Sequence, residues 1–211
     1  METRHPQLEE LIALLERLRA PGGCAWDREQ THESLVQYLV EETYELVDAI
    51  EAGDRDDLIE ELGDVLYQVI FHADIAAEAG QFTLEDVAAH MSAKMIGRHP
   101  HVFGDVVADT ADAVSANWDV IKQTEKPTRT SVLDGIPQAM PALALADKLV
   151  GRAEKVGVVV EAAAVPADET ELGETLLALV VGARERGLDA ERALRSALRD
   201  LQGRIREAET S

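Results

Sequence analysis

The fold is decided by two neighbouring segments, VEETYELVDAI at residues 40–50 and DDLIEELGDVLYQV at residues 56–69. In both segments and their flanks, apolar residues recur at steps of three and four, which is the spacing of one face of an α-helix. The apolar face is made by Leu35, Leu39, Leu46, Ala49 and Ile50 on the first helix and by Leu58, Leu62, Val65 and Val69 on the second. Because only Gly53 and Asp54 separate the two helices, they are predicted to pack antiparallel.

The same kind of pattern extends over most of the chain. Helices are expected at about residues 6–20, 31–52, 54–80, 83–97, 110–123, 142–155, 168–187 and 189–209. Strand alternation is absent except at residues 158–160, a run too short to form an element of its own. The sequence therefore predicts an all-α fold, an antiparallel helical bundle with a C-terminal helical extension.

Proline and glycine suggest where this fold is divided. Pro127, Gly135, Pro137 and Pro141 fall in one short stretch, which is typical of a linker. The expected organisation is a helical domain at residues 1–126, a linker at 127–141 and a helical C-terminal region at 142–211.

Composition excludes several classes of protein. The 211 residues include 20 Lys+Arg and 41 Asp+Glu, a formal net charge of −21 that argues against binding nucleic acid or an anionic membrane surface. A hydrophobic content of 46% is enough to form a core, so the acidity does not indicate disorder. The single cysteine, Cys24, excludes an intrachain disulfide and a cysteine-rich zinc site. No apolar signal segment is present, and a cytoplasmic protein is expected.

Four acids on the two central helices form the most informative pattern. Glu42 and Glu45 are three residues apart on one helix, and Glu61 and Asp64 repeat this spacing on the next, so each pair projects from one face. Glu42 falls inside the apolar sector, and Arg55 is the only Lys or Arg at residues 31–80. Carboxylates near a core need a counter-charge, and oxygen ligands favour Mg²⁺ or Mn²⁺. The alternative is a solvated acidic face.

Positive and aromatic residues further along the chain suggest a substrate for such a metal. Lys94 and Arg98 are four residues apart, as are Trp118 and Lys122. Cations beside Mg²⁺ would suit a polyphosphate, and Trp118 could stack on a base or ribose. Alternatively, Trp118 anchors the core and the lysines are surface charges.

Several separated motifs resemble the MazG family of nucleoside triphosphate pyrophosphohydrolases. EETYE at residues 41–45 and ELGD at 61–64 are similar to the E-E-x-x-E…E-x-x-D signature of that family. CAWDREQT at 24–31, RHPHVF at 98–103 and the segment 118–122 follow in family order, so that the resemblance covers about residues 6–155. The chain has Ala25 where the family usually has proline, a change expected to alter only the rigidity of that turn.

The resemblance implies an all-α, Mg²⁺-dependent enzyme that hydrolyses NTPs or dNTPs to monophosphate and pyrophosphate as a homodimer, with sites formed between helices of both chains. The metal ligands of the family map onto Glu42, Glu45, Glu61 and Asp64. Its positions for triphosphate and nucleoside map onto Lys94, Arg98, Trp118 and Lys122. Glu41 is a further acid that would bind a second ion, or orient the attacking water and accept its proton. Trp26 and Asp27 either line the nucleoside pocket or join two helices as a clasp.

Two other functions remain open at this point. One is an all-α pyrophosphohydrolase with a narrow substrate, of the dUTPase-like or phosphoribosyl-ATP-cleaving type. The other is a non-catalytic helical partner protein whose acids serve only solubility. A di-iron carboxylate bundle is rejected. Such a bundle needs a Glu-x-x-His motif on each of two helices, and the sequence has only one, at residues 29–32.

The C-terminal region contains what resembles half of a second acid motif. ELGE at residues 171–174 is similar to E-x-x-D, but no E-E-x-x-E precedes it, since residues 156–166 hold Glu161 alone as an acid. The region is interpreted as a degenerate, inactive second MazG-like repeat. The alternative is an unrelated helical hairpin, which would be equally inactive.

Overall fold

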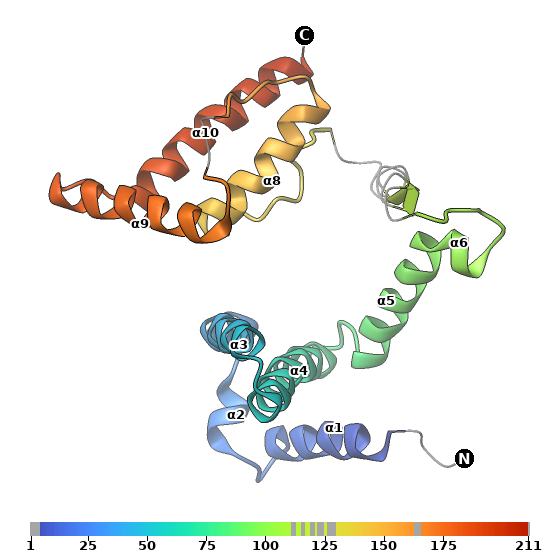
Figure 1. The fold of residues 1–211 in the computed structure, drawn as a ribbon. Coiled ribbons are helices and arrows are strands. Elements are labelled where there is room, and N and C mark those ends of the chain that lie inside the picture. Colours follow the sequence, from blue (N-terminus) through green and yellow to red (C-terminus); the bar gives the residue numbers. More distant parts are fainter. Residues whose placement is uncertain are drawn as a thin grey trace. The chain divides into compact units, whose positions relative to one another are not determined.

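The structure is a computed structural model that describes residues 5–110, 113–114, 117–118, 121, 125, 130–162 and 166–210. Every regular element among these residues is a helix, which confirms the predicted all-α class. The helices are α1 (Pro6–Arg19), α2 (Ala25–Glu29), α3 (His32–Ala52), α4 (Arg55–Glu78), α5 (Leu84–Arg98), α6 (Pro100–Phe103), α8 (Ala142–Lys155), α9 (Glu169–Glu185) and α10 (Ala190–Glu209) (Figure 1). The chain divides into two compact units, Met1–Ile121 and Lys122–Ser211.

The described helices agree with the sequence pattern in most places. The short helices α2 and α6 are not predicted by the pattern, because one turn of helix is too short to show a 3.6-residue period. The expected helix at residues 110–123 lies largely outside the described residues. None of the helices in the described part of the chain is long and apolar enough to cross a membrane.

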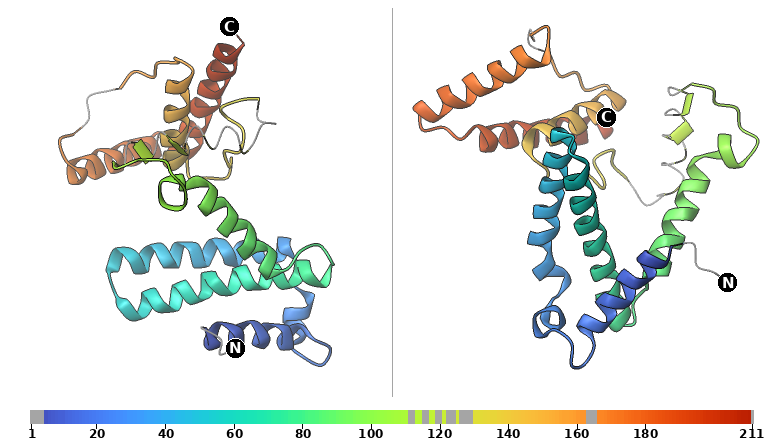
Figure 2. Two further views of the ribbon diagram at one scale, coloured as in Figure 1. Left: turned by 90° about the vertical axis from the view of Figure 1, so that its right-hand side faces the viewer. Right: turned by 60° about the horizontal axis from the view of Figure 1, so that its bottom comes forward.

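The α3–α4 hairpin of the first unit is fixed by local hydrogen bonds at its ends. The Thr31 hydroxyl accepts from the Ser34 amide, and the Ser34 hydroxyl accepts from the Thr31 amide, which closes a capping box at the start of α3. Gly53 ends α3 at φ +72°, a conformation that strains other residues. Asp54 then caps α4 by accepting from the amides of residues 56 and 57. The two helices lie side by side in both views of Figure 2.

A buried arginine joins three helices of the first unit. Arg19, at the end of α1, donates from Nε to Asp74 Oδ2 (2.5 Å) and from Nη2 to Glu78 Oε2 (2.6 Å), both on α4. Its Nη1 donates to the backbone oxygen of Asp27 on α2 (2.7 Å). The guanidinium also lies 5.2 Å from the centre of the Phe71 ring, a cation–π contact. Arg19 therefore closes α1, α2 and α4 around the apolar core, which consists of Leu15, Leu35, Ile70 and Phe71 with their neighbours.

The apolar sector of the hairpin is only partly covered. Leu62 and Val69 on α4 and Ile50 on α3, all predicted to face the core, are 51%, 42% and 58% exposed. Each helix presents a stripe of exposed apolar side chains, formed by Val36, Val40, Val47 and Ile50 on α3 and by Ile59, Leu62, Leu66 and Val69 on α4. The prediction that Ile50, Leu62 and Val69 face the core was wrong, because the packing within a single chain buries only part of each apolar stripe.

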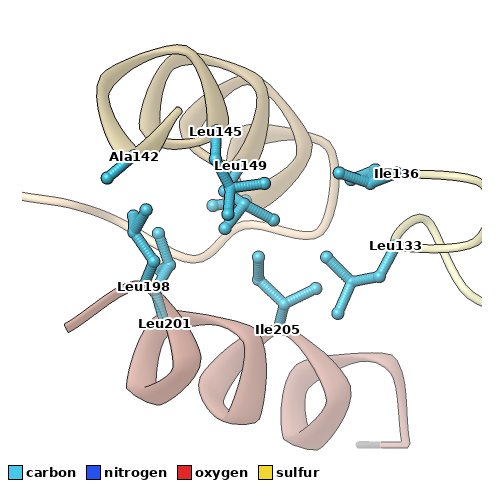
Figure 3. Packing of buried hydrophobic residues seen from close by; sticks show 9 residues of the cluster. Leu133, Ile136, Ala142, Leu145, Leu149, Leu198, Leu201 and Ile205 are labelled. Atoms are coloured by element: carbon cyan, nitrogen blue, oxygen red, sulfur yellow. The ribbon is translucent and has the colours of Figure 1, made fainter. Parts of the chain in front are cut away.

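The second unit has its own core between α8 and α10. Figure 3 shows leucines of α8, among them Leu149, facing Leu198, Leu201 and Ile205 of α10. Leu133 and Ile136 pack against the same cluster and are 8% and 7% exposed. The described part of the expected linker, residues 130–141, therefore belongs to this unit, because its apolar residues pack into the core.

Two glutamates of α10 bind backbone amides far away in sequence. Glu191 accepts from the amide of Ala142 at the start of α8, a helix whose own N-cap, Pro141, offers no side-chain acceptor. Glu209 accepts from the amide of Val132 and from the hydroxyl of Ser131. The last helix of the second unit thus forms hydrogen bonds with residues 131, 132 and 142.

Candidate functional site

Three acids of the hairpin converge on one point. Glu42 and Glu45 lie one turn apart on α3, and Glu61 faces them from α4. Each offers a carboxylate oxygen, and these three oxygens lie within 4.8 Å of one another. The antiparallel pairing of α3 and α4, predicted from the short Gly53–Asp54 connection, is what brings them together.

The electrostatics of this cluster are unfavourable without a cation. Burial raises the pKa of Glu42 above its ordinary value of 4.5, and the carboxylates of Asp64 and Glu45 raise it further. The pKa of Glu61 is also raised, first by burial and then by Glu45 and Asp64. Asp64 is half-buried, and its negative charge acts on both Glu42 and Glu61, so it is part of the same electrostatic cluster.

One carboxylate oxygen of the cluster has no accessible surface. Within the described part of the chain, Glu61 Oε2 finds no hydrogen-bond donor. The only lysine or arginine on α3 or α4, Arg55, pairs with Asp56 at the exposed start of α4 (2.9 Å). A buried carboxylate oxygen without a partner is costly, and a cation among three acids would satisfy it. The donor set therefore fits a metal ion with oxygen ligands.

An aromatic pair lies one turn before the acids on α3. The rings of Trp26 on α2 and Tyr38 on α3 meet edge to face, with their centres 5.7 Å apart. Trp26 remains 49% exposed, and Tyr38 precedes Glu42 by four residues, which places it on the same side of the helix. The pair thus presents a partly exposed aromatic surface on the side of α3 that carries Glu42.

The remaining predicted residues take different places. Asp27 is 9% exposed, and its backbone oxygen binds Arg19, so it lies in the clasp that the sequence offered as an alternative. Glu41 is exposed on α3, beside the three acids but outside the converging set. Lys94 and Arg98 are half-buried and one turn apart on α5. Lys122 lies outside the described residues.

Trp118 lies in a cluster of rings that the sequence pattern does not predict. Its ring meets His99 edge to face at 5.3 Å, and His99 lies 5.5 Å from the ring of His101. His99 Nδ1 is 2.7 Å from the backbone oxygen of Met95. The motif RHPHVF contains the signal, because Pro100 turns the chain after α5 and brings the two histidines together. In Figure 1, α5 extends away from α3 and α4.

Comparison with known proteins places these features in one family. The sequence profile of the MazG nucleotide pyrophosphohydrolase domain matches residues 30–103, which include Glu41, Glu42, Glu45, Glu61 and Asp64. The chain is 49% identical to an uncharacterized 26.1 kDa protein from the blaB 3′ region of Streptomyces cacaoi, over 96% of this chain and 83% of that protein.

Two relatives carry functional names. The nucleoside triphosphate pyrophosphohydrolase of Escherichia coli K12 is 40% identical, over 96% of this chain and 87% of its own length. The nucleoside triphosphate pyrophosphohydrolase/pyrophosphatase MazG of Thermotoga maritima is 41% identical, over 95% and 85% of the two chains. At this identity over nearly the whole of both sequences, the chain belongs to the MazG nucleotide pyrophosphohydrolase family.

Proposed function

We propose that the chain hydrolyses nucleoside triphosphates to the monophosphate and pyrophosphate, with Mg²⁺ as cofactor and Mn²⁺ as a substitute. The observation that carries this proposal is the convergence of Glu42, Glu45 and Glu61 on one point with a buried, unsatisfied oxygen. The names of the full-length relatives support the substrate class. Bound among these acids, Mg²⁺ would supply charge neutralisation for the triphosphate and activation of a water molecule.

Residues of the chain take the other roles in the proposed reaction, which are metal binding, proton transfer and substrate binding. Glu42, Glu45, Glu61 and Asp64 would hold the cation. Exposed Glu41 accepts a proton from the attacking water, whose oxygen bonds to phosphorus while the α–β anhydride bond breaks and pyrophosphate leaves. Lys94, Arg98 and Lys122 bind phosphate oxygens, and the rings of Trp118 and of the Trp26–Tyr38 pair contact the nucleoside.

The proposal is tested by measuring pyrophosphate release from the eight common NTPs and dNTPs, with Mg²⁺ and with a chelator. We expect release from several nucleotides, and none with the chelator. Cleavage of a single nucleotide would favour the narrow-specificity enzyme. No release from any of the eight, together with no Mg²⁺ binding in calorimetry, would favour the non-catalytic partner protein.

The raised pKa values make Mg²⁺ binding depend on pH. Because the folded chain holds the pKa of Glu42 and Glu61 above 4.5, these groups favour the folded state at low pH and disfavour it once they ionise. The cation needs the ionised form, so protons compete with it as the pH falls. We expect Mg²⁺ to raise the melting temperature clearly at pH 7 and much less at pH 5, measured by calorimetry.

Matched variants separate this effect from the general charge of the chain. Glu42→Gln should lose most of the Mg²⁺-dependent shift at pH 7. Asp48→Asn, an exposed acid on the same helix, should keep it. An equal shift at both pH values, or a full shift in Glu42→Gln, would contradict the assignment.

The C-terminal region is proposed to be a degenerate repeat without catalytic activity. Glu171 and Glu174 lie on α9, and the structure describes no second pair of acids in this unit that completes a cluster with them. Changing both to Gln should leave pyrophosphate release within a factor of about two, since exposed substitutions away from a site have small effects. If this double change abolishes hydrolysis and Asp64→Asn does not, the active site lies in the C-terminal region and not in the first unit.

A homodimer is proposed for the first unit. The apolar stripes of α3 and α4 are exposed in a single chain, and the same stripes of a second copy would bury them. Since α5 extends away from the hairpin, a second copy could also bring its Lys94 and Arg98 to these acids. We expect sedimentation to give the mass of two chains at micromolar concentration. A mass of one 23.0 kDa chain would contradict the proposal.

A further inference from the structure

Two half-buried histidines of the first unit, His32 and His72, meet head on. His32 is the first residue of α3, and His72 lies on α4. Their Nδ1 atoms are 2.7 Å apart, which is a hydrogen-bond distance. The ring centres are 5.0 Å apart, and the ring planes differ by 7°. This separation equals the contact between the nitrogens plus the radii of the two rings. The rings of this histidine pair therefore lie end to end in nearly one plane, with one proton between the two nitrogens.

The head-on contact restricts how the histidine pair can be protonated. One Nδ1 carries the proton and donates it, and the other accepts. A first additional proton can enter at the outer nitrogen of the donating ring, where it strengthens the bond. A second must enter at the accepting Nδ1, so that two N–H groups would face each other. Burial lowers the pKa of His72 below its ordinary value of 6.5, and the charge of His32 lowers it further. The bond therefore holds at neutral pH and is lost in acid.

The charged groups around the histidine pair largely balance one another. Those that line the cavity next to His32 come from α1, α2, α3 and α4, and are Arg19, Arg28, Glu33 and Glu78. The first and last of these are bonded to each other, and the other two are exposed and opposite in sign. From α5, Glu85 borders a different cavity together with Asp74, which lies about 200° around α4 from His72. The titration of the pair is thus set mainly by burial and by the contact between the rings.

The histidine pair ties the corner between α2 and α3, residues 26–34, to α4. Within this corner, Ser34 Oγ donates to Gln30 Oε1 (2.7 Å), and Gln30 Nε2 donates to the backbone oxygen of Trp26 (2.9 Å). The Trp26 ring in turn meets Tyr38 edge to face. Trp26 is therefore held by bonds that begin in the first turn of α3, and His32 joins this same turn to α4.

We propose that His32 and His72 are positioning residues that act through Trp26 on the binding of the nucleoside. While the two rings share a proton, the corner stays on α4 and the Trp26 ring stays at Tyr38, on the side of α3 that carries Glu42. When both rings are charged, their bond is lost and Trp26 is released from Tyr38. The contact of Trp26 with the nucleoside rests on the proposed function, whereas the release of Trp26 in acid does not.

The release of Trp26 is tested in the full chain without nucleotide or cation. Trp118→Phe leaves Trp26 as the only tryptophan, and its fluorescence is followed from pH 8 to pH 5. We expect the emission to change only as the pH falls below 6.5, because the pKa of His72 is lowered from that value. His72→Asn should abolish the change, since its amide reaches the place of Nδ1 and bonds to His32 but takes up no proton. No change in the parent chain, or the same change with His72→Asn, would overturn the proposal.

Two measurements separate the histidine pair from other titrating groups. Glu42→Gln, which removes an acid whose pKa is raised, should leave the change in emission in place. In the chain with both tryptophans, ¹⁵N nuclear magnetic resonance follows the imidazole rings directly. The ring signal that disappears in His72→Asn should titrate below pH 6.5. Titration at or above that pH, or loss of the emission change in Glu42→Gln, would overturn the proposal.

The effect on the nucleoside is tested by kinetics with Mg²⁺ at pH 7.5. His72→Ala should raise KM for a nucleoside triphosphate about five- to tenfold, the scale of one lost hydrogen bond, and leave kcat within about twofold. His72→Asn should restore KM, because it keeps the bond. His5→Gln, which removes an exposed histidine of the same unit, should change neither constant. An unchanged KM in His72→Ala, or a loss in kcat alone, would overturn the positioning role. Absence of turnover in the unaltered chain would refute the proposed function and this role with it, whereas the fluorescence titration would still decide whether the pair holds Trp26.

Discussion

Asp64→Asn is expected to lower kcat for nucleoside triphosphate hydrolysis by at least about 100-fold, the scale of losing an essential electrostatic group. The substitution keeps the volume of the side chain and removes its charge. Asp64 acts on the pKa of both Glu42 and Glu61, so its carboxylate contributes to the field that would hold the cation. Glu45→Gln, which removes one of the three converging oxygen ligands as a charged group, should lose activity on the same scale.

Two controls decide what a loss of activity means. Asp48→Asn makes the same chemical change at an exposed position of α3 and should retain kcat. Circular dichroism and melting temperature should show that Asp64→Asn remains folded. Turnover near the original value in Asp64→Asn or in Glu45→Gln would refute the assignment of the metal ligands.

Arg19→Ala is expected to lower the free energy of unfolding of the first unit by roughly 3–5 kcal/mol, the cost of removing one partner from a buried ion pair. The side chain of Arg19 is 5% exposed and that of Asp74 is 22% exposed, so Asp74 would be left as a poorly solvated charge. The backbone oxygen of Asp27 would also lose its donor. Both tryptophans, at positions 26 and 118, belong to the first unit, so their fluorescence in urea follows this unit selectively.

Arg17→Ala is the matched control for Arg19→Ala and its loss of the bonds to residues 27, 74 and 78. Arg17 lies on the same helix two residues earlier and is exposed, so the change should cost less than about 0.5 kcal/mol. An equal loss for both variants would show that the effect comes from α1 in general and not from the clasp. The double variant Arg19→Met/Asp74→Leu should recover much of the loss, because it leaves no buried unpaired charge; the other acid partner, Glu78, is 74% exposed and stays solvated.

The local parts of the fold follow directly from the sequence. Thr31, Gly53 and Asp54 act within a few residues, through caps and one left-handed turn, so their pattern is sufficient to place α3 and α4. The role of Arg19 could not be predicted in the same way. Its position in the apolar stripe of α1, four residues after Leu15, indicates that it faces inward. Its three partners at positions 27, 74 and 78 depend on how the helices pack.

The candidate site shows the same division. The spacing of Glu42, Glu45 and Glu61 and the short connection between their helices predict that they converge, and the structure brings their oxygens together. The contacts of Trp26 with Tyr38 and of Trp118 with His99 depend on turns at α2 and α6 that no periodicity reveals. The exposed stripe with Leu62 could not be foreseen either, because a pattern of apolar residues does not distinguish a core from a surface between two chains.

The bonds from Glu191 and Glu209 to the start of the second unit determine when that unit can fold during synthesis. The first unit has all of its residues once the ribosome has passed position 121. The second unit cannot satisfy the amides of Ala142 and Val132 until residues 191 and 209 have been made. The nascent chain therefore exposes the leucines of α8 to chaperones until translation has reached the end of α10, whereas the hairpin with the acids can form early.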